Sequence, residues 1–135
     1  MRKVVAEAGL TSKIVLDSAG TGHWHLGELP DPRTREAAAK RGMELTHLAR
    51  QFKPADLDKF DLVIAMDRAN LRQLKTTLGV RKQPVIALLR SFDPDAPPDA
   101  EIPDPYAGGA DGFELVLDLC EAACRGLLAH VRNKL

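Results

Sequence analysis

Cysteine and aromatic residues are scarce in this chain. Among its 135 residues there are two cysteines, one tryptophan, one tyrosine and four phenylalanines. Two cysteines cannot build a disulfide framework, so a reducing, cytoplasmic compartment is expected. The length suits a single domain, residues 1–135, that is large enough to bury one core.

Net charge and long apolar runs are also missing. Nineteen basic residues balance nineteen acidic ones, so no net field favours nucleic acid or a membrane surface. No apolar run approaches the roughly 20 residues that span a bilayer. The N-terminal segment has no apolar stretch followed by a cleavage site, so it is not a signal peptide. We therefore expect neither a nucleic-acid partner nor a membrane partner.

Apolar runs alternate with helix signals along the chain. The apolar runs predict three strands, at 14–16, 62–66 and 85–89. Capping residues and apolar periodicity predict four helices, over 2–8, from Asp31 to Gly42, from Asp67 to Gly79, and from near Gly112 onward. The continuous run at 62–66 fits a strand buried on both faces of a parallel sheet. Together these elements predict an α/β fold.

A long loop rich in Asp and Pro covers residues 91–110 and contains Ile102–Gly108. Loops of this length inside compact domains are often functional. Asp104 is a carboxylate between two prolines, with Tyr106 two residues further on, which suits a general acid beside a flat substrate. The same residues also fit an ordinary turn, because Asp-Pro and Gly are turn residues. Taken alone, the segment leaves both interpretations open.

A second loop, from Gly20 to Gly27, holds the single tryptophan, Trp24. An exposed tryptophan between glycines can wall an aromatic-binding cleft. The alternative is a tryptophan folded back onto the core. His23 and His25 flank it, but no third ligand at metal-site spacing is nearby, so they are weak evidence for a metal.

Other polar residues and both cysteines have ordinary structural explanations when taken singly. His47, which begins the segment HLARQ, fits a hydrogen-bonded structural histidine. Asp67, three residues before Asn70, fits a helix cap. Cys120 and Cys124 lie on the apolar stripe of the last helix, where a buried cysteine behaves as a small hydrophobe.

The order and spacing of these motifs carry more information than any one of them. The series runs through Asp17–Thr21, the Trp24 loop, Pro30–Arg33, His47–Gln51, Met66–Asp67 with Asn70–Leu71, Phe92–Pro94 and Asp104–Tyr106. It resembles the low-molecular-weight protein tyrosine phosphatases, and the resemblance covers the entire chain. The resemblance implies a three-layer, flavodoxin-like parallel sheet with helices on both faces.

The same resemblance implies two-step phosphoryl transfer that needs no metal or other cofactor. A thiolate in a Cys-x5-Arg loop attacks the phosphorus of a phosphotyrosine-containing protein or an aryl phosphate. An aspartic acid protonates the leaving phenolate and then activates water. By resemblance, Asp104 is that acid and base, and Trp24 and Tyr106 hold the substrate ring. The matches to residues that support or adjoin the phosphate loop are Ser18, His47, Asp67 and Asn70.

Two departures from the family pattern stand out. Ala107 occupies a position where family members often have a second aromatic residue. More importantly, no Cys-x5-Arg occurs in the chain; Cys120 with Arg125 is one residue too short and lies in a predicted helix. We expect a chain truncated at its N-terminus, without the first, central strand and the phosphate loop. Such a chain should be inactive by itself, and unpaired sheet edges would favour self-association.

Three alternatives to this interpretation remain, two of which are enzymes that share the fold implied by the resemblance. An arsenate reductase of the same fold would need relay cysteines, for which two cysteines on one helix face are poorly placed. A non-catalytic binding or regulatory relative could use the remaining cleft. A phosphoarginine phosphatase of this architecture differs in the loop that the chain lacks, so the preference for phosphotyrosine or phosphoarginine stays open.

Overall fold

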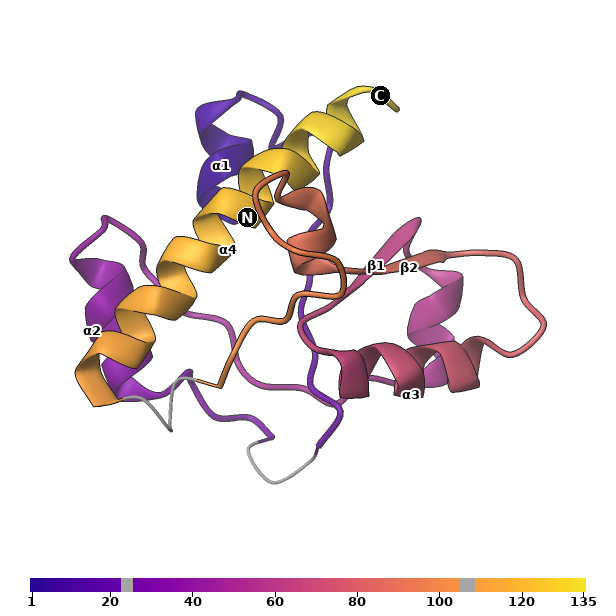
Figure 1. Ribbon diagram of the computed structural model, residues 1–135, viewed down its shortest axis with the longest axis horizontal. Helices are drawn as coiled ribbons and strands as arrows, with labels where there is room; N and C mark the ends of the chain where they lie inside the picture. The colour runs from indigo at the N-terminus through magenta and orange to yellow at the C-terminus, as the bar shows by residue number, and fades with distance from the viewer. Residues whose placement is uncertain (23–25, 105–108) are drawn as a thin grey trace. The chain divides into compact units, whose positions relative to one another are not determined.

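The computed structural model describes residues 1–22, 26–104 and 109–135 (Figure 1). Its elements are α1 (Arg2–Glu7), α2 (Pro32–Ala39), the 3-10 helix η1 (Pro54–Asp58), β1 (Leu62–Ala65), α3 (Arg68–Leu78), β2 (Val85–Leu88), the 3-10 helix η2 (Leu89–Phe92) and α4 (Gly109–Arg132). Two compact units are formed, one by Met1–Phe52 with Asp104–Asp118 and one by Lys53–Pro103 with Leu119–Leu135. The order of elements confirms the predicted α/β class.

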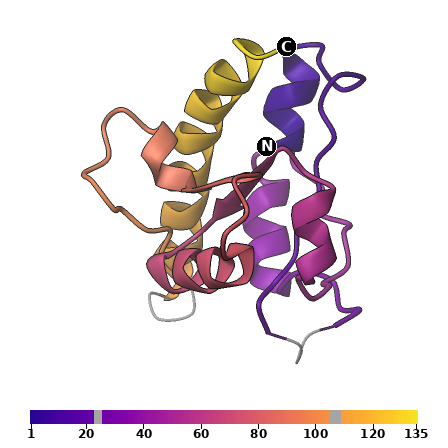
Figure 2. The same ribbon diagram turned by 90° about the vertical axis from the view of Figure 1, so that its right-hand side faces the viewer.

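The second unit contains a parallel β-α-β arrangement. β1 and β2 pair in parallel, with Leu62 opposite Val85 and Ala65 opposite Leu88. α3 connects the two strands and contacts both of them, as Figures 1 and 2 show. The predicted parallel sheet is therefore confirmed. Burial is less complete than expected, because only Ala65 of β1 is fully buried.

Local capping chemistry sets the ends of α2 and α3. The Asp31 carboxylate accepts a hydrogen bond from the Arg33 amide at 2.8 Å, and Pro32 occupies the first helical position. Asp67 caps α3 in the same manner. α3 ends at Gly79, whose φ of +60° is a conformation that glycine adopts without steric cost. Both predicted helix starts are confirmed.

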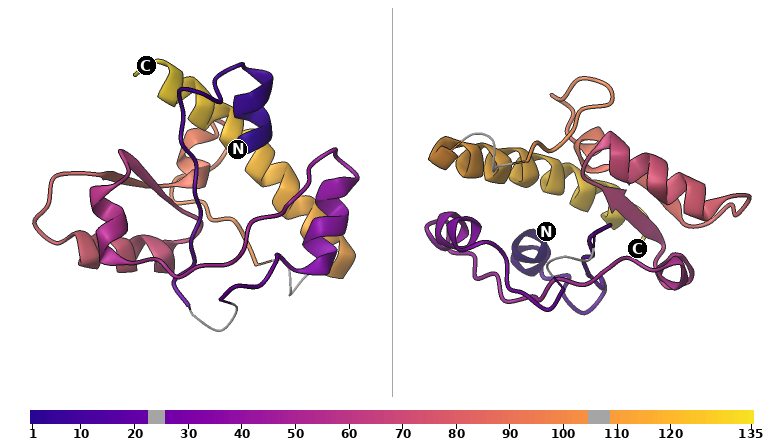
Figure 3. Two further views of the ribbon diagram at one scale, coloured as in Figure 1. Left: turned by 180° about the vertical axis from the view of Figure 1, so that it is seen from behind. Right: turned by 90° about the horizontal axis from the view of Figure 1, so that it is seen from below.

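The first unit is built from α1, α2 and the beginning of α4 (Figure 3). The Lys3 ammonium donates to the Arg41 carbonyl at 2.7 Å, which ties α1 to the turn after α2. The Arg41 guanidinium bridges Glu114 Oε2 at 2.6 Å and Asp118 Oδ1 at 2.9 Å on α4. These two carboxylates, led by Glu114, raise the pKa of Arg41. One cation thus connects the turn after α2 to α4 within this unit.

Residues 14–19 do not have the secondary structure that the sequence predicted. A strand was expected at 14–16, but residues 14–19 have no regular secondary structure. Within the described ranges, the β-bridge nearest to this segment is the isolated one between Gly20 and Gln51. The side chain of Val15 is 85% exposed. β-branched composition favours an extended chain, but a strand also requires a partner along its length. Without such pairing, the prediction of a strand here is wrong.

Helix α4 is amphipathic, as its spacing predicted, although it begins at Gly109 and not near Gly112. Its buried apolar residues are Phe113, Ala123, Cys124, Leu127 and Leu128. The remaining faces carry charged side chains. No helix in the described part of the chain is long and apolar enough to cross a membrane.

Within the second unit, α4 packs closely against η2 at Gly126. A methyl group added there would overlap the carbonyl oxygen of Phe92 and lie 2.8 Å from its carbonyl carbon. The Phe92 ring also packs against the His130 ring, with centroids 5.1 Å apart. The contact is with backbone, so a side-chain rotation cannot relieve it.

We therefore expect Gly126→Ala to lower the free energy of unfolding by about 3 kcal/mol, the upper range for overpacking. Helix propensity alone predicts the opposite, a gain of about 1 kcal/mol. Urea denaturation followed by circular dichroism distinguishes the two. The control is Ala129→Gly at an exposed position of the same helix, which should cost about 1 kcal/mol through propensity alone. An unchanged or raised midpoint for Gly126→Ala would refute the close packing.

Candidate active site

Three of the sequence motifs meet on the segment 47–51 of the first unit. The Gly20 amide donates to the Arg50 carbonyl at 2.9 Å, and the Phe52 amide donates to the Gly20 carbonyl at 2.8 Å. The other end of the tryptophan-containing loop joins the same segment, since Gly27 N–H donates to the Ala49 carbonyl and Ala49 N–H donates to the Glu28 carbonyl, each at 2.8 Å. Backbone hydrogen bonds therefore join segments that are about 20 to 30 residues apart in sequence.

Ser18 is fixed through its neighbour Asp17. Asp17 Oδ1 accepts from the Ser18 amide at 2.8 Å, and Asp17 Oδ2 pairs with the Arg50 guanidinium at 3.1 Å. His47 is half-buried on the segment that carries Arg50. Ser18 and His47 thus lie on two segments that are joined by an ion pair and by backbone hydrogen bonds. Sequence reasoning missed Asp17 and Arg50, although their opposite charges in two of the motifs were a usable signal.

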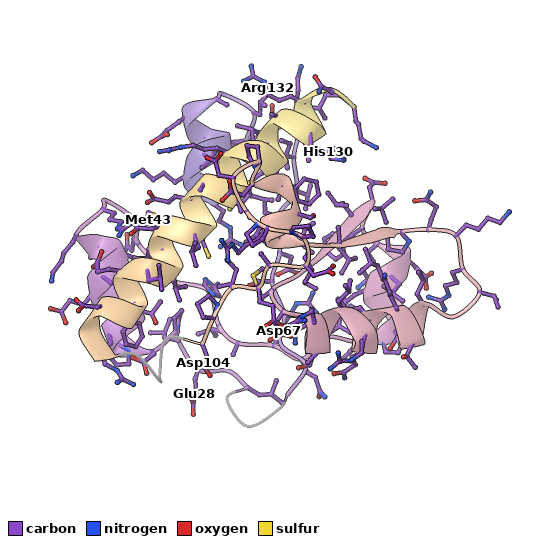
Figure 4. All side chains as sticks on the ribbon, viewed as in Figure 1. Glu28, Met43, Asp67, Asp104, His130 and Arg132 are labelled. Carbon is purple, nitrogen blue, oxygen red and sulfur yellow. The ribbon has the colours of Figure 1, made fainter. Side chains whose placement is uncertain are left out.

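Asp104 has an exposed side chain on the segment that leads into α4, as labelled in Figure 4. The preceding residues are held in place within the second unit. The Ile102 amide donates to the Met66 carbonyl at 2.8 Å, and Arg90 Nη1 donates to the Glu101 carbonyl at 3.2 Å. An exposed carboxyl group on a fixed loop can exchange protons with a bound ligand or with water.

Asp67 and Asn70 lie in the first turn region of α3. Asp67 Oδ1 accepts a hydrogen bond from the Asn70 amide at 2.7 Å. This confirms the helix-cap explanation for Asp67, and it satisfies one of the amides that a helix start leaves unpaired. The contact also fixes the backbone at Asn70. A role for either residue beside a phosphate loop stays a prediction.

Trp24 and Tyr106, predicted to hold a substrate ring, lie outside the described residues, as do His23 and His25. Ala107 falls in the same undescribed range. The contacts described above therefore include none of these residues.

Neither cysteine has the surroundings of a nucleophile. Cys124 is buried and Cys120 is half-buried in α4. Burial, with a smaller contribution from Cys124, raises the pKa of the Cys120 thiol to about 11. The reactive form of cysteine is the thiolate, so Cys120 is almost entirely in its unreactive form near neutral pH. The prediction that these cysteines act as small hydrophobes agrees with their burial.

We expect Cys120 to be alkylated by iodoacetamide about a hundredfold more slowly than an exposed cysteine at about pH 8, because its thiolate fraction is smaller by that factor. The matched control is Ala122→Cys, at an exposed position of the same helix. Peptide mass mapping over a time course gives the rate at each site. Equal rates at the two positions would contradict the burial of the Cys120 thiol.

No three His, Cys, Asp or Glu side chains converge as a metal-binding group among the described residues. A groove of about 530 Å³ runs along α2 in the first unit. Its lining residues are Pro32, Arg35, Glu36, Ala39, Gly42, Met43, Glu44 and Leu45. None of these was predicted as a site residue.

Comparison with known proteins establishes the family. The model of the low molecular weight phosphotyrosine protein phosphatase family matches residues 1–135. A low molecular weight protein-tyrosine-phosphatase of Streptomyces coelicolor is 47% identical over 135 residues, covering 98% of this chain and 82% of that protein. The chain therefore belongs to the low molecular weight phosphotyrosine protein phosphatases, a family of hydrolases, as its motifs predicted.

Solved structures agree with this assignment. A protein tyrosine phosphatase of Entamoeba histolytica superposes with a TM-score of 0.92 at 32% identity, covering 98% of this chain and 85% of that one. An arginine phosphatase of Drosophila superposes with a TM-score of 0.86 at 28% identity, covering 96% of this chain and 84% of that one. The predicted fold class is thereby confirmed.

Proposed function

We propose that residues 1–135 form one domain that supplies the general acid and base, the ring contacts and the loop supports of a protein-tyrosine phosphatase. The observation that carries the proposal is the joining of Asp17–Thr21 to His47–Gln51 by backbone hydrogen bonds and by the Asp17–Arg50 ion pair. This joining brings Ser18 and His47 onto neighbouring segments. Asp67 and Asn70 are proposed to stabilise the phosphate loop from the start of α3.

In the first chemical step, a cysteine thiolate attacks phosphorus and the bond from phosphorus to the phenolic oxygen breaks. The carboxylic acid of Asp104 gives its proton to that oxygen, so that a neutral phenol leaves. A phosphocysteine remains. Trp24 and Tyr106 are proposed to hold the aromatic ring during this step. The exposed Asp104 side chain is consistent with access to a bound substrate.

In the second step, the Asp104 carboxylate accepts a proton from water as the water oxygen attacks the phosphocysteine. The bond from sulfur to phosphorus breaks, inorganic phosphate leaves, and the thiolate and the protonated Asp104 are regenerated. Every proton and electron pair is accounted for by one thiolate, one carboxyl group and one water. The chemistry requires no metal or other cofactor.

The nucleophile is the part that these residues do not provide. The sequence contains no Cys-x5-Arg, and the raised pKa of Cys120 makes it a poor substitute. We therefore propose that the 135 residues alone do not hydrolyse phosphotyrosine. The proposed role of residues 1–135, as the source of the acid and the supporting residues, is tested by joining the strand and Cys-x5-Arg loop of a family member ahead of Met1 and assaying aryl phosphate hydrolysis. An inactive but folded fusion would contradict it.

The substrate class is proposed to be phosphotyrosine in a protein, or an aryl phosphate. The aromatic pair Trp24 and Tyr106 favours an aromatic phosphoester over arsenate. It does not decide between phosphotyrosine and phosphoarginine, and one structural neighbour is named an arginine phosphatase. The arsenate reductase alternative is less favoured, because both cysteines lie on α4 and are at least partly buried. Two fusions, one with the loop of a tyrosine phosphatase and one with the loop of an arginine phosphatase, are each assayed with phosphotyrosine and with the phosphoramidate phosphoarginine. A preference for phosphotyrosine in both fusions would assign that preference to residues 1–135.

We also propose self-association through sheet edges and a cytoplasmic location. The described sheet has two strands, β1 and β2, each with one edge that is not hydrogen-bonded to a further described strand. Val85 of β2 is 46% exposed, and exposed apolar edges favour pairing with another chain. Two free cysteines suit a reducing compartment.

A further inference from the structure

The backbone just before Asp104 is held by contacts from three different elements. Glu101 Oε2 accepts a hydrogen bond from the Arg68 amide, at the start of α3, at 2.7 Å. The Arg68 guanidinium lies 3.5 Å from the other carboxylate oxygen. Arg90, in η2, donates to the Glu101 carbonyl, and the carbonyl of Met66, the residue that follows β1, accepts from the Ile102 amide. The side chain, the carbonyl and the following amide are therefore each anchored.

We propose that Glu101 and Arg90 are positioning residues. They fix the conformation of the backbone before Asp104 and so the position of the Asp104 carboxyl group. The inference rests on the proposed role of Asp104 as general acid and base. Neither residue is proposed to touch the substrate. They act by holding the backbone from which the acid extends.

The covalent structure after this anchor explains how its effect reaches Asp104. Pro103 has a fixed φ and restricts the conformation of Ile102 before it. Pro105 restricts Asp104 in the same way. The backbone of residues 102–104 therefore has few accessible conformations. A backbone rotation at Glu101 consequently changes the position of the Asp104 carboxyl group. A flexible linker of the same length would absorb such a rotation.

Charge strengthens the anchor at neutral pH. The backbone amide of Arg68, followed by its guanidinium, lowers the pKa of Glu101, and Arg72 on the same helix acts in the same direction. Arg90 faces the Glu101 carbonyl from η2. A carboxyl group whose pKa is lowered on folding contributes stability above its ordinary pKa and loses it as pH falls through the lowered value. The anchor should therefore weaken only under acidic conditions.

The test uses hydrogen exchange and NMR on the 135-residue chain, so it does not depend on catalysis. We expect Glu101→Gln, which removes the charge from the bond with the Arg68 amide, and Arg90→Met, which removes the bond to the Glu101 carbonyl, each to accelerate exchange of the Ile102 amide about tenfold. The 13C resonance of the Asp104 carboxyl carbon should shift in both variants. Arg90→Lys, which keeps a cationic donor, should restore most of the protection.

The matched control is Asp58→Asn, since Asp58 pairs with Arg81 at the same 3.5 Å separation within this unit, and Asp58 lies in η1, away in sequence from the Asp104 loop. It should leave Ile102 exchange and the Asp104 resonance unchanged. Unaltered Ile102 exchange in Glu101→Gln and Arg90→Met would overturn the proposal. So would faster exchange with an unmoved Asp104 resonance, or equal effects in Asp58→Asn. Failure of the phosphatase assay would leave these readouts unaffected, which separates the two proposals.

Discussion

Purified as these 135 residues, the protein is expected to hydrolyse an aryl phosphate no faster than buffer does. Asp104 can donate a proton to a leaving phenolate only while a nucleophile displaces it. The chain has no Cys-x5-Arg loop, and burial keeps Cys120 protonated. Loss of a covalent nucleophile costs on the order of a millionfold in a serine protease, so the residual rate should be undetectable in a steady-state assay.

The comparison is the fusion that carries the strand and Cys-x5-Arg loop of a family member ahead of Met1. Phosphatase activity should appear in this fusion and disappear again when the introduced cysteine is replaced by serine. Equal folding of the two fusions is checked by circular dichroism. Turnover by the 135-residue chain, with its intact mass confirmed, would show that a group other than the loop cysteine performs the attack.

In the active fusion, Asp104→Asn should lower kcat by a factor of about 10² to 10⁴, the usual contribution of a general acid or base. Asparagine has nearly the same shape and cannot transfer the proton. The loss should be greater for phenyl phosphate than for a nitrophenyl phosphate, because the more basic phenolate depends more on protonation. The limb of the pH–rate profile that reports the ionisation of Asp104 should disappear as well. This is the basic limb if Asp104 acts as the acid in the slower step, and the acidic limb if it acts as the base.

The control for this variant is Asp99→Asn in the same long loop. Asp99 is exposed and has a φ of +59°, a conformation that asparagine tolerates well. Its substitution should leave kcat within about twofold, since surface changes usually have effects below 0.5 kcal/mol. A similar loss in both variants would point to a general disturbance of the loop and not to proton transfer by Asp104.

Features set by neighbouring residues were predictable from the sequence. Asp31 and Asp67 each cap a helix through an amide two or three residues away, so local pattern was sufficient to place the helix starts. Gly79 ends α3 for a similarly local reason. The strand predicted at 14–16 failed because a strand depends on a partner elsewhere in the chain, which composition does not encode.

The same distinction applies to the site. The motif series identified the family, since order and spacing are properties of the sequence. The contacts that organise the predicted site residues within each of the two units are long-range. Asp17 pairs with Arg50, and the Glu101 carboxylate reaches an amide 33 residues away. Opposite charges in the sequence show that such pairs are available, but only the folded backbone selects which of them form.

The most direct test of the account is to search for a covalent phosphoenzyme by mass spectrometry. The 135-residue chain and the active fusion are each mixed with an aryl phosphate, quenched rapidly and digested. We predict one added phosphoryl group on the introduced loop cysteine of the fusion, with none on Cys120 or Cys124 of either protein. A phosphoryl group on Cys120 or Cys124, or turnover by the fusion without a phosphocysteine, would contradict the account.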